Sequence, residues 1–173
     1  MRRLDRIAIT RRLLVLAASS LLALPIAAAS GGSPSVSGSV TAAGKTYKLA
    51  HVYVRRQPSA ADKTQIVVVV LLTDNEVPRN IVDDKYRLEL TDMARDGKIH
   101  GVSVTIGPDK KPSETGWIYA KEVGGALVSR ADQQTFEPGR FDDSHVEGKV
   151  SGHGSFGDDK WEFAASFAAS LSK

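Results

Sequence analysis

A strict alternation of apolar and polar residues near the C-terminus constrains the fold of this chain more than any other feature. The apolar members are Trp161, Phe163, Ala165, Phe167, Ala169 and Leu171. Successive side chains of a β-strand point to opposite faces, so this period of two predicts a long strand with one buried face. An amphipathic helix would place its apolar residues three or four positions apart. The chain is therefore expected to build on β-sheets.

A second alternating segment comes directly before this strand. Its inward positions are Val146, Gly148, Val150, Gly152, Gly154 and Phe156. We expect the two segments to form a hairpin that turns over residues 157–160, with Phe156 opposite Trp161 and Val150 opposite Phe167. A slip of one residue would turn every apolar side chain toward solvent, so the pattern restricts the register strongly.

The segment after residue 35 follows the same scheme. Its inward positions Val36, Gly38, Val40 and Ala42 are expected to face Tyr47, Leu49 and His51 across a tight turn at Ala43-Gly44. The continued alternation places Tyr53 on the same semi-buried face, and Arg55 follows. Tyr47, His51, Tyr53 and Arg55 are therefore the candidate ligand-binding residues, because a half-buried histidine between two tyrosines can contact a ligand. The alternative is a core histidine with a structural hydrogen bond.

The middle of the chain adds further strands and one helix. Residues 66–72 are apolar on both faces and rich in β-branched side chains, which is typical of a central strand. Residues 80–95 carry apolar side chains at helical spacing and end before Gly97. Strands are expected at 100–106, 117–121 and 126–129, and an irregular polar stretch at 131–144. The fold class is mainly β: an antiparallel β-sandwich or a small barrel with one inserted α-helix.

The first 29 residues have the composition of a signal peptide. Five arginines precede an apolar run that ends in Ala27-Ala28-Ala29. We expect cleavage near Ala29-Ser30, a flexible lead-in at 30–35, and one β-rich domain at 36–173. The processed protein would be periplasmic or secreted, with no integral membrane segment. Thr10-Arg11-Arg12 resembles a twin-arginine export signal, and an ordinary Sec signal remains the alternative.

Net charge argues against a nucleic-acid partner. The whole chain has 23 Lys and Arg against 20 Asp and Glu, but the signal peptide holds five Arg and one Asp. The remainder has 18 basic and 19 acidic residues, without the basic clusters that neutralise phosphates. The chain has no cysteine, which excludes disulfides, zinc–thiolate sites and cysteine nucleophiles.

Other motifs with possible chemistry have simpler explanations. Residues 152–157 spell G-x-G-x-x-G, but a strand follows them where a nucleotide site needs a helix N-terminus. His153, Ser155 and Asp158 are the residue types of a hydrolytic triad, yet they are strand and turn neighbours without a nucleophile elbow. The four histidines are scattered, so the sequence predicts no metal site, no cofactor and no catalytic residues.

The runs Gly38–Thr41, Gly44–Val54 and Val69–Asp74 resemble a pattern in small exported bacterial β-domain proteins of unassigned function. The resemblance implies an extracytoplasmic β domain and assigns no catalytic residue. The sequence therefore favours an exported, non-enzymatic domain that binds a protein, glycan or small ligand. The alternative is a small extracytoplasmic hydrolase that uses His51 or His153.

Overall fold

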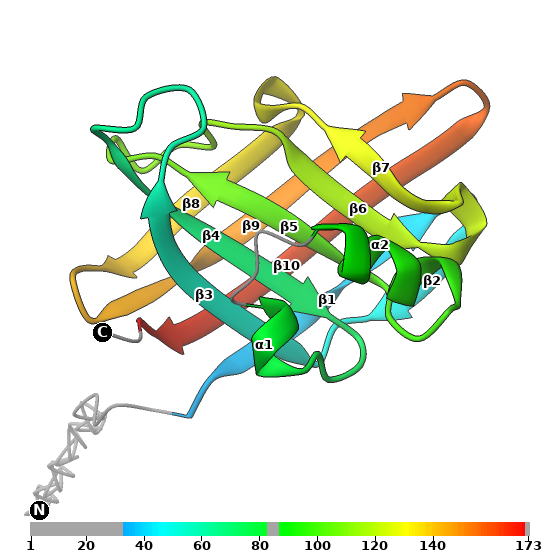
Figure 1. Cartoon of the computed structure of the whole chain (residues 1–173), viewed down its shortest axis with the longest axis horizontal. Helices are drawn as coiled ribbons and strands as arrows, with labels where there is room; N and C mark the ends of the chain where they lie inside the picture. The colour runs from blue at the N-terminus through cyan, green and yellow to red at the C-terminus, as the bar shows by residue number, and fades with distance from the viewer. Residues whose placement is uncertain (1–32, 83–86, 172–173) are drawn as a thin grey trace, which may run out of the picture.

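The computed structural model describes residues 33–82 and 87–171 and arranges them in two stacked, five-stranded antiparallel sheets (Figure 1). Sheet A has the order β2-β1-β10-β9-β8, and sheet B has the order β3-β4-β5-β6-β7. The sheets do not close into a barrel, so the predicted β-sandwich is confirmed. The predicted signal peptide, residues 1–29, lies outside the described residues.

The strands of sheet A are β1 (Ser35–Ala42), β2 (Lys45–Lys48), β8 (Gln134–Phe141), β9 (His145–Phe156) and β10 (Asp159–Ser170). Those of sheet B are β3 (His51–Pro58), β4 (Ile66–Thr73), β5 (Gly101–Ile106), β6 (Gly116–Ala120) and β7 (Gly125–Ser129).

The chain changes sheets twice. It forms the β1–β2 hairpin in sheet A, crosses at residues 49–50, and runs through sheet B as the meander β3 to β7. It then returns to sheet A as the meander β8 to β10. All eight residues of β1 pair with β10. The first hairpin turns over Ala43 and Gly44, whose φ values of 46° and 79° fit the two-residue turn that matches strand twist.

The main hydrophobic core fills the space between the two sheets. The predicted inward residues of β10 are all buried there, and Trp161 and Phe163 stack with their ring centroids 6.2 Å apart. Val68, Val70 and Leu72 of β4 face them from sheet B. The alternation of β10 therefore predicted this side of the core correctly.

A second core lies on the outer face of sheet B, beneath two short helices. These are α1 (Arg79–Val82) and α2 (Arg87–Arg95), which lie within the predicted helical stretch on either side of residues 83–86, outside the described residues. Leu90 and Ala94 of α2 pack on Leu71 and Tyr119. The predicted stop at Gly97 is confirmed: its φ is +72°, and backbone bonds from residues 97 and 98 close the last turn. Tyr86, an apolar position of the predicted helical stretch 80–95, lies outside the described residues. No helix among the described residues is long and apolar enough to cross a membrane.

The predicted register of the last hairpin is wrong by two residues. Trp161 lies opposite Gly154 and Ala165 opposite Val150, because β9 and β10 are joined by a turn of only two residues, Gly157 and Asp158. A shift of two preserves the faces, so the inward residues up to position 154 remain inward. Phe156 is the exception: it lies at the hairpin tip and is 73% exposed.

Two further expectations are wrong. The stretch 131–144 is not irregular, because most of it forms strand β8 next to β9. Its alternation covers only Gln134 to Glu137 before Pro138 and a register shift interrupt it.

In addition, Tyr47 and His51 do not belong to one strand. The chain leaves sheet A after Lys48, so side-chain alternation does not continue from one to the other.

Candidate functional site

The structure separates the four predicted ligand-binding residues. Tyr47 lies on β2 in sheet A, whereas His51, Tyr53 and Arg55 lie on β3 in sheet B. Tyr53 and Arg55 line one narrow cleft on the outer face of sheet B, and Tyr47 is not part of it. The predicted set is therefore not one site, and its members must be considered separately.

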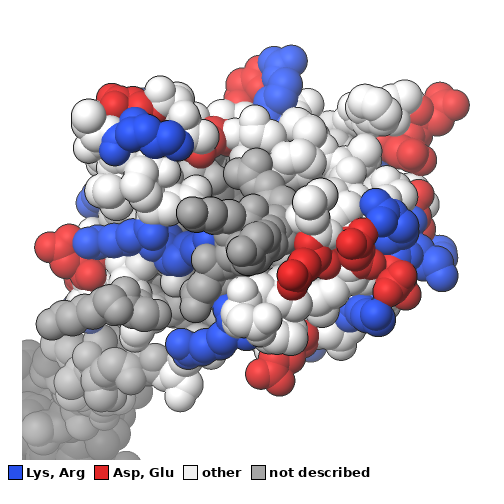
Figure 2. Space-filling view, viewed as in Figure 1, with Lys and Arg blue, Asp and Glu red and all other residues white. Residues whose placement is uncertain are grey.

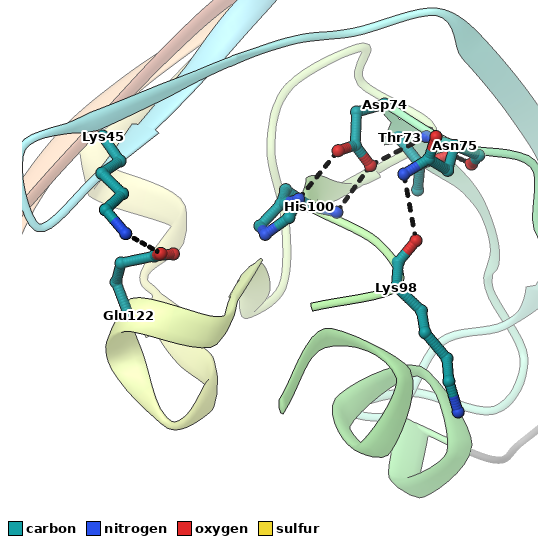
Figure 3. A network of polar contacts seen from close by, with 7 residues as sticks. All are labelled: Lys45, Thr73, Asp74, Asn75, Lys98, His100 and Glu122. Carbon is teal, nitrogen blue, oxygen red and sulfur yellow. Dashed lines mark hydrogen bonds and ion pairs between the residues drawn. The ribbon is translucent and has the colours of Figure 1, made fainter. Parts of the chain in front are cut away.

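Tyr47 packs on a histidine that the sequence did not single out. Its ring stacks on that of His100 with the centroids 3.6 Å apart and the planes 2° from parallel. Asp74 holds His100 in place: the His100 backbone N–H donates to Oδ1 at 2.7 Å, and Nδ1 lies 2.7 Å from Oδ2 (Figure 3). Tyr47 comes from sheet A, and Asp74 and His100 flank strands of sheet B. The contact therefore joins the two sheets.

An ion pair extends this cluster. Lys45 Nζ on β2 donates to Glu122 Oε1 at 2.9 Å, and Glu122 belongs to a short 3₁₀ helix between β6 and β7 (Figure 3). The Glu122 side chain is 13% exposed and that of Lys45 is 66% exposed. We call the group that consists of Lys45, Tyr47, Asp74, His100 and Glu122 the clasp.

Burial and charge perturb two groups of the clasp. Burial, together with the nearby carboxylates of Glu122 and Asp74, raises the pKa of the Tyr47 phenol to about 12. Burial opposes ionisation of Glu122, but the Lys45 ammonium and the Tyr47 hydroxyl outweigh it and lower the pKa of this carboxyl to about 2. At neutral pH the clasp therefore contains a neutral phenol and an ionised Glu122.

The chemistry of the clasp is that of a structural link with one acid–base pair. This pair is Asp74 and His100, whose Oδ2 and Nδ1 atoms lie within hydrogen-bond distance of each other. No serine or threonine hydroxyl bonds to His100 among the contacts of the described residues. No group of three His, Asp or Glu side chains converges in residues 33–82 and 87–171, so the described part of the chain offers no metal site.

The cleft beside Tyr53 and Arg55 is narrow. It lies between β3, β4, β5 and the helices, and its free volume of about 30 Å³ has room for about two water molecules. The Tyr53 hydroxyl accepts a hydrogen bond of 2.7 Å from the backbone N–H of Val77. Tyr53 therefore fastens the segment before α1 to the sheet.

A long hollow surface lies on the outer face of sheet A. Four adjoining depressions, of about 460, 270, 370 and 480 Å³, run along β10 between β1 and β9. Neighbouring depressions share lining residues: Ser37 and Ser166 join the first two, Ala164 joins the next two, and Thr41 and His153 join the last two. They therefore form one continuous surface, which we call the groove.

The lining of the groove is rich in hydroxyl side chains. Its hydroxyl side chains are Ser35, Ser37, Ser39, Thr41, Thr135, Ser151, Ser155 and Ser166. Its charged residues are of both signs: Lys149 and Lys160 are basic, Glu137, Glu147 and Glu162 are acidic, and His153 lies opposite Glu162. Small side chains make the groove hollow, because longer ones would fill the space above the sheet.

The motifs that the sequence analysis set aside lie within this sheet. Residues 152–156 of the G-x-G-x-x-G pattern belong to β9 and lead through a turn into β10, as expected. Gly152 and Gly154 allow close packing, because an added Cβ would lie 2.6 Å from Phe163 and 2.5 Å from Trp161. His153 lies opposite Glu162 on the groove face, and no hydroxyl group of the described residues bonds to its ring.

No protein-family model, curated protein or solved structure matches this chain. The site must therefore be argued from its own geometry. Sequence reasoning missed both the clasp and the groove. The groove had a signal: polar positions of β1, β9 and β10 alternate with the core residues, and most are serine, threonine or alanine.

Proposed function

We propose that this chain is an exported, non-enzymatic β domain that binds a glycan chain in the groove of sheet A. The observation that carries the proposal is the continuity of the groove, whose four depressions are lined by β10 from Lys160 to Ala168. Nine residues at about 3.3 Å each span about 30 Å. This length suits an extended polymer better than a compact small ligand.

The lining of the groove suits a polyhydroxylated partner. Each serine or threonine hydroxyl both donates and accepts hydrogen bonds, as do the hydroxyl groups of a sugar. Two hydroxyl pairs are already connected in the sheet: Thr41 Oγ1 lies 2.9 Å from Thr46 Oγ1, and Thr135 Oγ1 lies 2.6 Å from Ser151 Oγ. Such pairs fix the orientation of the groups that would contact a sugar.

The side chains that line the groove argue against two other classes of partner. A nucleic acid requires clustered cations, but the groove mixes lysines and glutamates. The described part of the face with the helices likewise mixes both signs without a broad patch of either (Figure 2). An amphipathic helix would need an apolar groove, whereas hydroxyl and charged side chains line this one.

Binding to polysaccharides tests the proposal. The purified protein should sediment with an insoluble polysaccharide, and a panel of cell-wall and extracellular glycans should reveal at least one such partner. Ala164→Arg places a long side chain in the middle of the groove, at an exposed position, and should reduce binding at least tenfold while the melting temperature stays within a few degrees.

Ala61→Arg is the matched control. Ala61 is an exposed alanine in the loop between β3 and β4, away from sheet A, so its variant should bind as the wild type does. Equal binding by both variants would contradict the groove as the site. Binding to extended peptides but to none of the glycans would contradict the proposed class of ligand.

The alternative, a small hydrolase, has one observation in its favour. Asp74 orients His100 as an acid would orient a catalytic base. However, none of the four depressions of the groove includes His100, and Tyr47 covers one face of its ring. Ester or glycoside hydrolysis that His100→Gln abolishes, with folding retained, would favour this alternative over the binding domain.

A further inference from the structure

The four sheet edges of the sandwich are not equally protected against pairing with another strand. An edge strand carries unpaired N–H and C=O groups, and charged residues, prolines and bulges are the usual protection. β2 has Lys45 and Lys48, and β8 has Pro138 and a register shift. β3 has two arginines and ends at Pro58. β7 has none of these devices.

β7 has the sequence Gly125-Ala126-Leu127-Val128-Ser129, with no charge and no proline. It pairs regularly with β6 across all five residues. Within the described part of the chain, residues 126–128 form no backbone hydrogen bond to a third strand. Val128 is 49% exposed on the outer face of sheet B, although valine is usually buried in a strand.

A second exposed apolar side chain lies on the element that covers β7. α2 packs against β7 and β6, and it carries Leu88, which is 78% exposed. Gly125 fixes this contact: an added Cβ would lie 2.7 Å from the backbone oxygen of Thr91 in α2. The exposed edge strand and the exposed leucine thus belong to one packed unit of the fold.

We propose that β7 is a dimerisation edge, which pairs antiparallel with β7 of a second copy of this chain and joins two B sheets into one of ten strands. The residues of β7 are complementary to those of a second β7 that runs antiparallel to it. With a two-fold axis at Leu127, Val128 lies opposite Ala126 of the second copy, and Ser129 lies opposite its Gly125. Every such pair is uncharged, so no like charges meet.

This pairing also explains the exposure of Val128. Cross-strand neighbours on one face lie about 5 Å apart, so Ala126 and Val128 of the two copies form two equivalent apolar pairs on the outer face. Each Val128 side chain is then covered by the other copy. The groove lies on sheet A, so dimerisation through sheet B leaves it open.

Sedimentation measurements test this inference independently of glycan binding. Over a hundredfold range of concentration, the wild-type protein should reach twice the mass of one chain. Val128→Lys should weaken the dimer at least tenfold, since it places a charge on the shared edge. Ile66→Lys is the matched control: Ile66 is 51% exposed at the end of β4, and its variant should dimerise normally.

Hydrogen exchange provides a second readout that does not depend on a variant. The amides of residues 126–128 that point away from β6 should exchange more slowly as the protein concentration rises. A wild-type protein that stays monomeric throughout, or a Val128→Lys variant that still dimerises, would overturn the proposal. Equal loss of the dimer in the Ile66→Lys variant would also overturn it, because association would not depend on β7.

Discussion

Glu122 is the residue of the clasp whose replacement should most change the pH dependence of stability. Its pKa is lowered from 4.5 to about 2, so in the folded protein it stays ionised where an unfolded glutamate takes up a proton. A pKa that is lower in the folded state stabilises the fold above pH 4.5, and this contribution is lost as the pH falls toward 2.

The size of this contribution to stability follows from the pKa shift of Glu122 and from the exposure of its partner Lys45. At about 1.4 kcal/mol for each pKa unit, the change from 4.5 to about 2 corresponds to about 3 kcal/mol at most. Lys45 is 66% exposed, so solvent screens the ion pair. We therefore expect a contribution of about 1–2 kcal/mol to the free energy of unfolding at neutral pH.

Urea unfolding, followed by tryptophan fluorescence, measures this contribution. The wild type should lose about 1–2 kcal/mol more than Glu122→Gln does between about pH 6 and about pH 2.5. Asp143→Asn is the control, because Asp143 forms an ion pair with Arg56 but is 99% exposed. Its pH profile should follow the wild type. Parallel profiles for the wild type and Glu122→Gln would refute the coupling of Glu122 to the fold.

Three further changes test the packing. Gly148→Ala should lower the free energy of unfolding in urea by about 1–3 kcal/mol, because the added Cβ would lie 2.3 Å from Cε2 of Phe136. Unchanged stability would show that β8 moves aside freely. Trp161→Ala should cost about 3–5 kcal/mol in the same assay, whereas exposed Lys160→Ala should stay within about 0.5 kcal/mol; equal losses would contradict the core assignment. His100→Ala should cost about 1–3 kcal/mol in thermal unfolding, because its carboxylate partner loses a buried hydrogen bond; an unchanged melting temperature would contradict the structural role of the clasp.

The elements with a long, regular period could be predicted from the sequence. β10 keeps one apolar face over twelve residues, and β4 is apolar on both faces because one side meets the main core and the other meets the helices. β8 could not be predicted in the same way. Its alternation lasts only four residues before Pro138 interrupts it, so its pairing with β9 is a property of the tertiary fold.

The candidate site was harder to predict because it depends on how segments meet. The members of the clasp come from positions 45, 47, 74, 100 and 122, and only the topology brings them together. The parity argument that selected His51 fails at Leu49 and Ala50, where the chain passes between sheets. A period of two holds within one strand, so a sequence pattern cannot show that the strand ends and changes partner.

The clasp and the groove are connected through β2. This strand has four residues and a single neighbour, β1, so little else fixes its position. On one side of the strand, Lys45 and Tyr47 form the contacts of the clasp. On the other side, Thr46 and Lys48 lie beside Thr41 and Ser39, which line the groove. The clasp thus holds the strand that borders the groove, although no member of the clasp lines it. A loosened clasp should therefore weaken the proposed glycan binding by disordering this border, without removing any group that lines the groove.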